Sequence, residues 1–182
     1  DASQWGSVDD IVPIPIEIYK ESKFLVKSGW FEPVKVWESS GTSGNPSRTP
    51  LEDTVVYDRT ISKQFYEVYG HIPHLSAVAF IPTPTEWPFS SLAYMFDVGV
   101  CEKLEPESIL RLVKAPQVTV EVASNLANLV IEMTRRSLNG DRLFLYGISY
   151  LFIIVMEEIR KLGFKPFLGE NPIVTDTGGY KG

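Results

Sequence analysis

The sequence predicts an α/β fold in which a mostly parallel sheet is layered with helices. Short apolar runs of strand length alternate along the chain with longer segments of helical periodicity. Loops rich in Gly and Ser follow two of the expected strands, at 39–48 and 177–182. Ligands of open parallel sheets bind beyond the carboxyl ends of the strands. These two loops therefore mark the edge at which we expect a binding site.

The first clear strand is expected over 34–39, where apolar and polar side chains alternate with the period of a half-buried strand. Upstream of it, Pro13 and Pro15 favour extended backbone over 12–18. The strand runs directly into the first glycine-rich loop. We expect the local order to be strand, loop and then helix.

That helix is expected over 53–69, because apolar residues recur there near helical spacing. Glu52 and Asp53 suit the positive end of a helix dipole, and Gly70 is well placed to end the helix. The apolar run 76–82 ends at a proline and has the length of a buried strand.

The C-terminal half continues the alternation. A helix is expected from about Ser91, where two serines can cap it, and 105–114 is amphipathic. Four further elements are expected after these: a helix over 121–138 closed by Asn139-Gly140, a strand over 142–146, a helix over 150–161 with Ser149 as a possible cap, and a strand over 173–177.

Composition limits the classes of function. With 182 residues, 44% of them hydrophobic, the chain can form a single domain with a packed core. A net charge of −6 with scattered Lys and Arg argues against nucleic-acid binding. The single Cys101 excludes an internal disulfide, and no unbroken run of roughly 18 apolar residues predicts a membrane span. We therefore expect a soluble, cytoplasmic protein, and the two chain ends suggest that 1–182 is a fragment of a larger domain.

The first glycine-rich loop has the composition of an anion site. Glycines allow close approach of the backbone to a ligand, successive backbone N–H groups can form a nest, and Arg48 can offer a planar fork to phosphate. The Gly-Lys-Ser/Thr ending of a Walker A loop is missing. Composition alone favours a plain solvent loop. The candidate phosphate-binding residues are Ser39, Ser40, Gly41, Thr42, Ser43, Gly44 and Arg48.

This loop resembles the phosphate loop of adenylate-forming enzymes, the superfamily of acyl-CoA synthetases, which has an SGTTG-type sequence followed by Pro. Within that superfamily the chain is most similar to the LuxE-type acyl-protein synthetases and related acyltransferases. Seven segments carry the likeness in the family's order: Ile14-Pro15 with Tyr19-Lys20, Ser39 to Ser47, Tyr69-Gly70-His71, Phe80-Ile81-Pro82, Ser90-Ser91-Leu92 with Tyr94-Met95, Leu145 to Ser149, and Thr177 to Gly182.

The resemblance implies that the chain is part of the large N-terminal domain of such an enzyme. It implies ATP-dependent activation of a carboxylic acid, often a fatty acid, to an acyl-adenylate, with acyl transfer to a protein thiol or another acceptor. ATP and Mg²⁺ are the implied cofactors, and an acyl-acceptor protein or a reductase is the implied partner. Loop 39–44 would hold the β- and γ-phosphates. A second turn would pass close to the adenine and the acyl carbonyl, and its residues are Thr177, Gly178, Gly179 and Tyr180.

The chain also departs from the family. Ser47 and Arg48 stand where many of these ligases have a Lys after the Pro. The ribose-binding Asp, a late catalytic Lys and the acyl-accepting Cys of the family are expected beyond Gly182, so the catalytic residues are unknown. Cys101 is expected to lie within a helix among apolar neighbours and to be buried and inert. The alternative function is a non-catalytic binding or assembly module that retains the fold.

Other sites have weaker support. His71 and His74 flank Pro73, which favours a structural turn over a metal site. The chain contains no Gly-x-Ser-x-Gly elbow of a serine hydrolase. Asp97 could be a buried acid, but the pattern favours exposure on the polar face of its helix.

Overall fold

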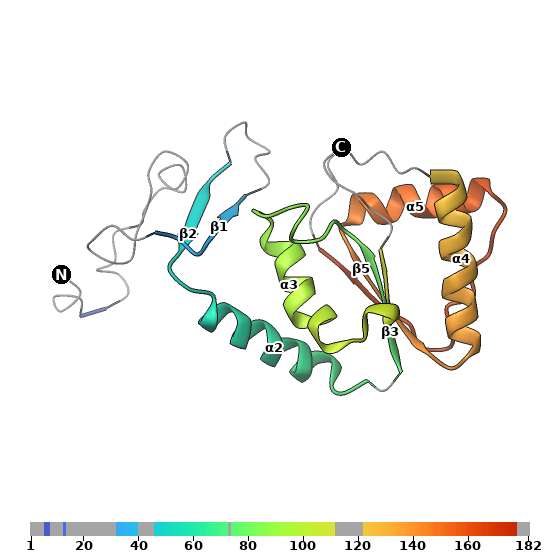
Figure 1. The fold of residues 1–182 in the computed structure, drawn as a ribbon, viewed down its shortest axis with the longest axis horizontal. Helices are drawn as coiled ribbons and strands as arrows, with labels where there is room; N and C mark the ends of the chain where they lie inside the picture. Colours follow the sequence, from blue (N-terminus) through green and yellow to red (C-terminus); the bar gives the residue numbers. More distant parts are fainter. Residues whose placement is uncertain are drawn as a thin grey trace. The chain divides into compact units, whose positions relative to one another are not determined.

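The computed structural model describes residues 6–7, 13, 32–39, 46–72, 74–111 and 122–177, with the side chains of 122–125 left aside. The extended segment expected at 12–18 therefore lies outside the described residues, apart from Pro13. The chain divides into two compact units, Asp1–Thr54 and Val55–Gly182, and each is described by itself. Element labels follow Figure 1.

The described part of the first unit is an antiparallel hairpin. Strand β1 (Lys35–Glu38) pairs with strand β2 (Arg48–Leu51), and the register runs from Lys35 opposite Leu51 to Glu38 opposite Arg48. Strand β1 confirms the strand expected over 34–39. The expected order of strand, loop and helix is wrong, because β2 follows the loop and satisfies backbone groups of β1.

The second unit is an α/β fold, as the sequence predicts. Helices and strands alternate along it, and two short 3₁₀ turns, η3 and η4, separate α3 from β4. In chain order its elements are α2 (Val55–Tyr69), β3 (Leu75–Phe80), α3 (Ser91–Gly99), η3 (Cys101–Lys103), η4 (Pro106–Ser108), β4 (Ile109–Arg111), α4 (Val122–Leu138), β5 (Arg142–Gly147), α5 (Ser149–Lys161) and β6 (Ile173–Asp176).

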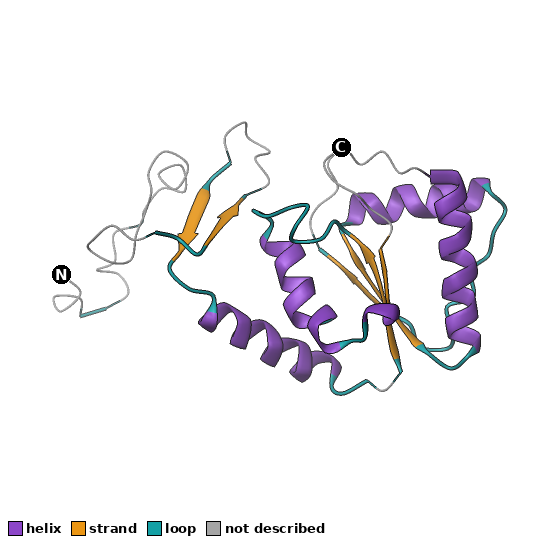
Figure 2. Cartoon of the chain, in the orientation of Figure 1, coloured by secondary structure: helices purple, strands orange, loops and turns teal. Residues whose placement is uncertain are grey.

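Four strands form one parallel sheet in the order β4-β3-β5-β6. The two central strands, β3 and β5, are almost wholly apolar and buried rather than alternating. This pattern follows from helices that cover both faces of the sheet, which leaves no solvated side for polar residues. Figure 2 shows the strands with helices on either side.

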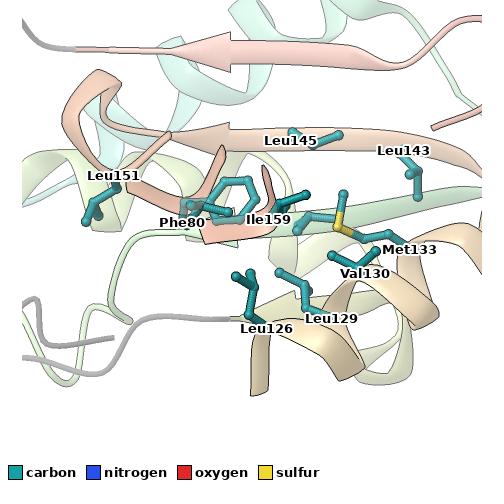
Figure 3. Close-up of a cluster of buried hydrophobic side chains, with 11 residues drawn as sticks. Phe80, Leu126, Leu129, Val130, Met133, Leu143, Leu145, Leu151 and Ile159 are labelled. Carbon is teal, nitrogen blue, oxygen red and sulfur yellow. The ribbon is translucent and has the colours of Figure 1, made fainter. Parts of the chain in front are cut away.

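Helices α4 and α5 cover one face. Their apolar side chains meet those of β3 and β5 in a single cluster (Figure 3), in which Leu126, Met133 and Leu151 are fully or almost fully buried. Burial of each such side chain contributes about 2 kcal/mol to folding. The cluster thus fixes both helices on the sheet.

Helices α2 and α3 cover the other face. Ala77 and Ala79 of β3 leave room beside the rings of Phe144 and Tyr146 on β5. The ring of Phe96 on α3 stacks on Tyr146 with centroids 4.5 Å apart. Small residues on one strand therefore let an aromatic layer fill the space beneath α3.

Candidate functional site

The two described ends of the first glycine-rich loop are bonded to each other. The backbone N–H of Ser39 donates to the carbonyl oxygen of Ser47 at 3.0 Å, and the N–H of Ser47 donates to Ser39 Oγ at 2.9 Å. These bonds extend the β1–β2 ladder by one pair and close the base of the loop. The remaining candidates, Ser40, Gly41, Thr42, Ser43 and Gly44, lie outside the described residues.

Arg48 begins β2 directly opposite Glu38. Its Nη2 lies 2.6 Å from Glu38 Oε1, and 63% of the Arg48 side chain is exposed. The carboxylate of Glu38 therefore already engages the guanidinium group that we expect to face phosphate. A phosphate-binding role for Arg48 stays a prediction, and it requires that phosphate compete with this exposed ion pair.

The second candidate segment starts at the carboxyl edge of the parallel sheet. The N–H of Thr177 donates to the carbonyl oxygen of Gly147 at 3.0 Å, which continues the pairing of β6 with β5. Thr177 thus follows its strand at the edge where parallel α/β sheets bind ligands. Gly178, Gly179 and Tyr180 lie outside the described residues.

The first turn of α5 lies at the same edge. The cap position is Ile148 rather than Ser149, and Ile148 makes no side-chain cap bond. Ser149 is the first helical residue, and its hydroxyl donates to Asp176 Oδ2 at 2.7 Å. An acid beside a helix N-terminus is favoured by the helix dipole. The pair therefore ties the start of α5 to the end of β6, one residue before Thr177.

Aromatic hydroxyls gather around the first turns of α2 and α3. Tyr94 donates to Asp58 Oδ1 at 2.8 Å, and the rings of Tyr57 and Tyr94 lie 6.1 Å apart. Burial raises the pKa of Tyr57 above its ordinary value, against the opposing effect of its hydrogen bond with Ser91. The sequence gives no signal for this group, because α2 and α3 meet only when both pack on the same face of the sheet.

Asp97 is not a free surface acid, contrary to the sequence expectation. Its Oδ1 accepts a hydrogen bond from Arg111 Nη2 at 2.8 Å, and both side chains are partly buried, with 34% of Asp97 and 22% of Arg111 exposed. Arg111 Nη2 also lies 3.2 Å from the sulfur of Cys101. The ion pair links α3 to the end of β4, a long-range contact that the helical pattern around Asp97 does not reveal.

Cys101 is buried, as expected, in the 3₁₀ turn η3 after α3. Burial raises the pKa of its thiol to about 12, outweighing the opposite effect of Arg111. A thiol in this state is a poor nucleophile at neutral pH.

The histidines sit where a turn is expected. His74 has a φ of 52°, a left-handed conformation that marks the tight turn before β3.

Over residues 32–39, 46–72, 74–111 and 122–177, no three His, Cys, Asp or Glu side chains are grouped so as to hold a metal ion. None of the helices in those ranges is long and apolar enough to cross a membrane.

No family model, curated protein or solved structure matches the chain.

Proposed function

We propose that this chain takes part in ATP-dependent activation of a carboxylic acid, with loop 39–44 as its nucleotide-phosphate loop. The acid is proposed to be a fatty acid. A carboxylate oxygen attacks the α-phosphorus of ATP, the bond to pyrophosphate breaks, and the products are an acyl-adenylate and pyrophosphate. The acyl group then passes to a protein thiol or another acceptor with release of AMP.

The observation that carries the proposal is the place of Thr177. It is bonded to Gly147 across the ends of two parallel strands, and α5 begins at Ser149 beside it. Nucleotides bind at the carboxyl ends of parallel strands and near helix N-termini, where backbone N–H groups and the helix dipole favour phosphate. A glycine-rich turn follows Thr177 in the sequence.

The hairpin supports the role of the first loop. A nest of backbone N–H groups needs a loop whose ends are held together. Bonds between Ser39 and Ser47, and between Glu38 and Arg48, join the two ends of this loop. In the proposed reaction the chain acts mainly by positioning phosphate and by stabilising charge as pyrophosphate leaves. Mg²⁺ bound with ATP would offset part of the phosphate charge.

Thermal melting with a non-hydrolysable acyl-adenylate analogue tests this function. An analogue present at about 100 times its Kd stabilises the folded state by about 2.7 kcal/mol, which raises Tm by roughly 5–10 °C for a chain of this size. AMP and the free fatty acid serve as matched controls that carry one half of the analogue each. If the analogue raises Tm no more than these halves do, the chain does not recognise an acyl-adenylate.

A non-catalytic binding or assembly module is the alternative. The ion pair between Arg48 and Glu38 favours it, because that pair partly neutralises the one cation of the phosphate loop. A module of this kind would bind the analogue or a protein partner yet release no pyrophosphate from ATP with any carboxylic acid. A pyrophosphate-release assay across a panel of acids separates the two functions once binding has been shown.

A further inference from the structure

A cavity of about 160 Å³ opens at the amino edge of the sheet in the second unit. The ends of α2 and α3 and the first residue of β3, Leu75, surround it. Thr177 lies at the opposite, carboxyl edge, so this cavity is separate from the segment that carries the proposed function. One segment of the family likeness, Tyr69-Gly70-His71, lines the cavity, but the sequence assigns it no ligand.

Three aromatic rings form its inner wall. The ring centroids of Phe65 and Tyr69 lie 5.5 Å apart, and Phe144 lies 6.1 Å from Phe65 and 5.2 Å from Tyr69. A hydrogen bond of 2.7 Å between the hydroxyls of Tyr69 and Thr175 holds the Tyr69 ring in place. Apolar cavities of about 150 Å³ with walls of this kind accept molecules of the size of benzene.

The position of Phe65 depends on a glycine. A Cβ at Gly99 would lie 2.6 Å from the Phe65 ring, so only Gly allows this ring to rest against the backbone of α3. The aromatic wall is therefore fixed from behind by α3 and from the side by Tyr69 and Phe144. A preformed wall lowers the cost of binding a flat apolar ligand.

Lys103 and His71 line the cavity. Lys103, the last residue of η3, is exposed and makes no ion pair with another described residue. Neither Asp nor Glu occurs among the described residues that line the cavity. The C-termini of α2 and α3 also lie here, and their partial negative charge opposes an anion, so the attraction of an anion to the rim comes from the Lys103 ammonium group. An incoming ligand therefore meets apolar rings inside and an ammonium group at the rim.

We propose that this cavity binds a small aromatic carboxylate. The ring packs against the rings of Phe65 and Tyr69, behind which Phe144 is buried, and the carboxylate pairs with the Lys103 ammonium group. This site does not depend on nucleotide binding.

Benzoate, benzyl alcohol and benzylammonium test the proposal, because they share one ring and differ in charge. Each is titrated into ¹⁵N-labelled protein while the amide resonances of Gly70, Lys103 and Leu104 are followed. We expect benzoate to bind most tightly and benzylammonium most weakly. Lys103→Gln should weaken benzoate binding about threefold to fivefold, the value of one partly exposed ion pair, and leave benzyl alcohol unchanged.

The matched control is Lys63→Gln, because Lys63 lies on α2, is exposed, pairs with Glu67 and does not line the cavity. It should leave benzoate binding unchanged. Absence of benzoate-induced shifts at these amides overturns the proposal. Equal affinity for the three probes, or unchanged benzoate affinity in Lys103→Gln, overturns it as well.

Discussion

The hydroxyl of Tyr146 is buried at the end of β5 without a hydrogen-bond partner in the described part of the chain. Burial raises the pKa of this phenol, which favours its neutral form. A buried hydroxyl without a partner costs about 1–3 kcal/mol. The ring itself contributes to core packing, because it stacks on the ring of Phe96.

Tyr146→Phe removes the hydroxyl and keeps the ring. We expect the free energy of unfolding in urea to stay the same or to rise by up to about 1 kcal/mol, since no hydrogen bond is lost. Tyr69→Phe is the matched control, because it loses the bond to Thr175 and should lower stability by about 1 kcal/mol. A clear loss of stability in Tyr146→Phe would show that its hydroxyl has a partner.

Cys101 gives a second prediction for a single residue. Its pKa of about 12 and its burial predict no alkylation by iodoacetamide in the native protein at pH 8. The same thiol should react completely after unfolding in urea. Mass spectrometry of the two samples measures the modified fraction, and rapid native labelling would contradict the buried position.

At the scale of single elements, α3 depends on its N-cap. Ser90 Oγ accepts a hydrogen bond from the N–H of Ala93 at 3.1 Å. Ser90→Ala should lower the free energy of unfolding by about 1 kcal/mol, and Ser90→Asp, which can still cap the helix, should restore most of it. Chemical denaturation of the three proteins checks this, and equal loss in both variants would mean that the cap bond contributes nothing.

Helix α4 predicts a pH dependence. Hydrogen bonds from Arg135 and Arg136 lower the pKa of Glu132 to about 2. The folded-state pKa lies below the unfolded value, so this stabilisation is present above about pH 4.5 and is lost as the pH falls towards 2.

Glu132→Gln should therefore lower the free energy of unfolding at pH 7 by about 1 kcal/mol, a small value because the group is partly exposed and screened. The difference from wild type should shrink as the pH falls from 4.5 to 2. Urea unfolding at several pH values measures it. A difference that stays constant over this range would refute the assigned role of Glu132.

The longer helices were predictable from local pattern. The helices expected over 53–69, 121–138 and 150–161 are found as α2, α4 and α5 within about two residues. The spacing of the apolar residues shows which face of each helix meets the sheet, so each of these helices can be predicted from its own sequence. The central strands β3 and β5 were predictable for a related reason, because both faces are covered and the runs are apolar throughout.

Short strands were not predictable in the same way. Strand β2 contains Pro50 and follows Pro46, so its local sequence favours a loop. Strand β4 has three residues inside an amphipathic segment. Each is a strand only because a distant partner, β1 or β3, pairs with it. The Asp97–Arg111 ion pair depends on β4 in turn and could not be found before the sheet was known.

At the scale of the molecule, the two ends of the parallel sheet in the second unit carry different groups of residues. Its carboxyl edge holds Thr177, the Ser149–Asp176 pair and the start of α5. Its amino edge holds the aromatic cavity with Lys103. The sequence drew attention to the first edge through the glycine-rich segment 177–182, whereas loop 39–48 follows a strand of the separate antiparallel hairpin. It could not predict the second, because those rings come from α2 and β5 and meet only in the folded sheet.

The central claim is that the chain binds ATP through the loop that contains Thr42. Isothermal titration with MgATP tests it most directly, using wild type, Thr42→Ala and Thr60→Ala. Thr60 is the matched control, because its hydroxyl bonds only within α2, to the Val56 carbonyl. We predict that wild type and Thr60→Ala bind equally and that Thr42→Ala binds about tenfold more weakly, the value of one hydrogen bond to a charged group. Absence of MgATP binding by wild type, or equal binding by all three proteins, would contradict the claim.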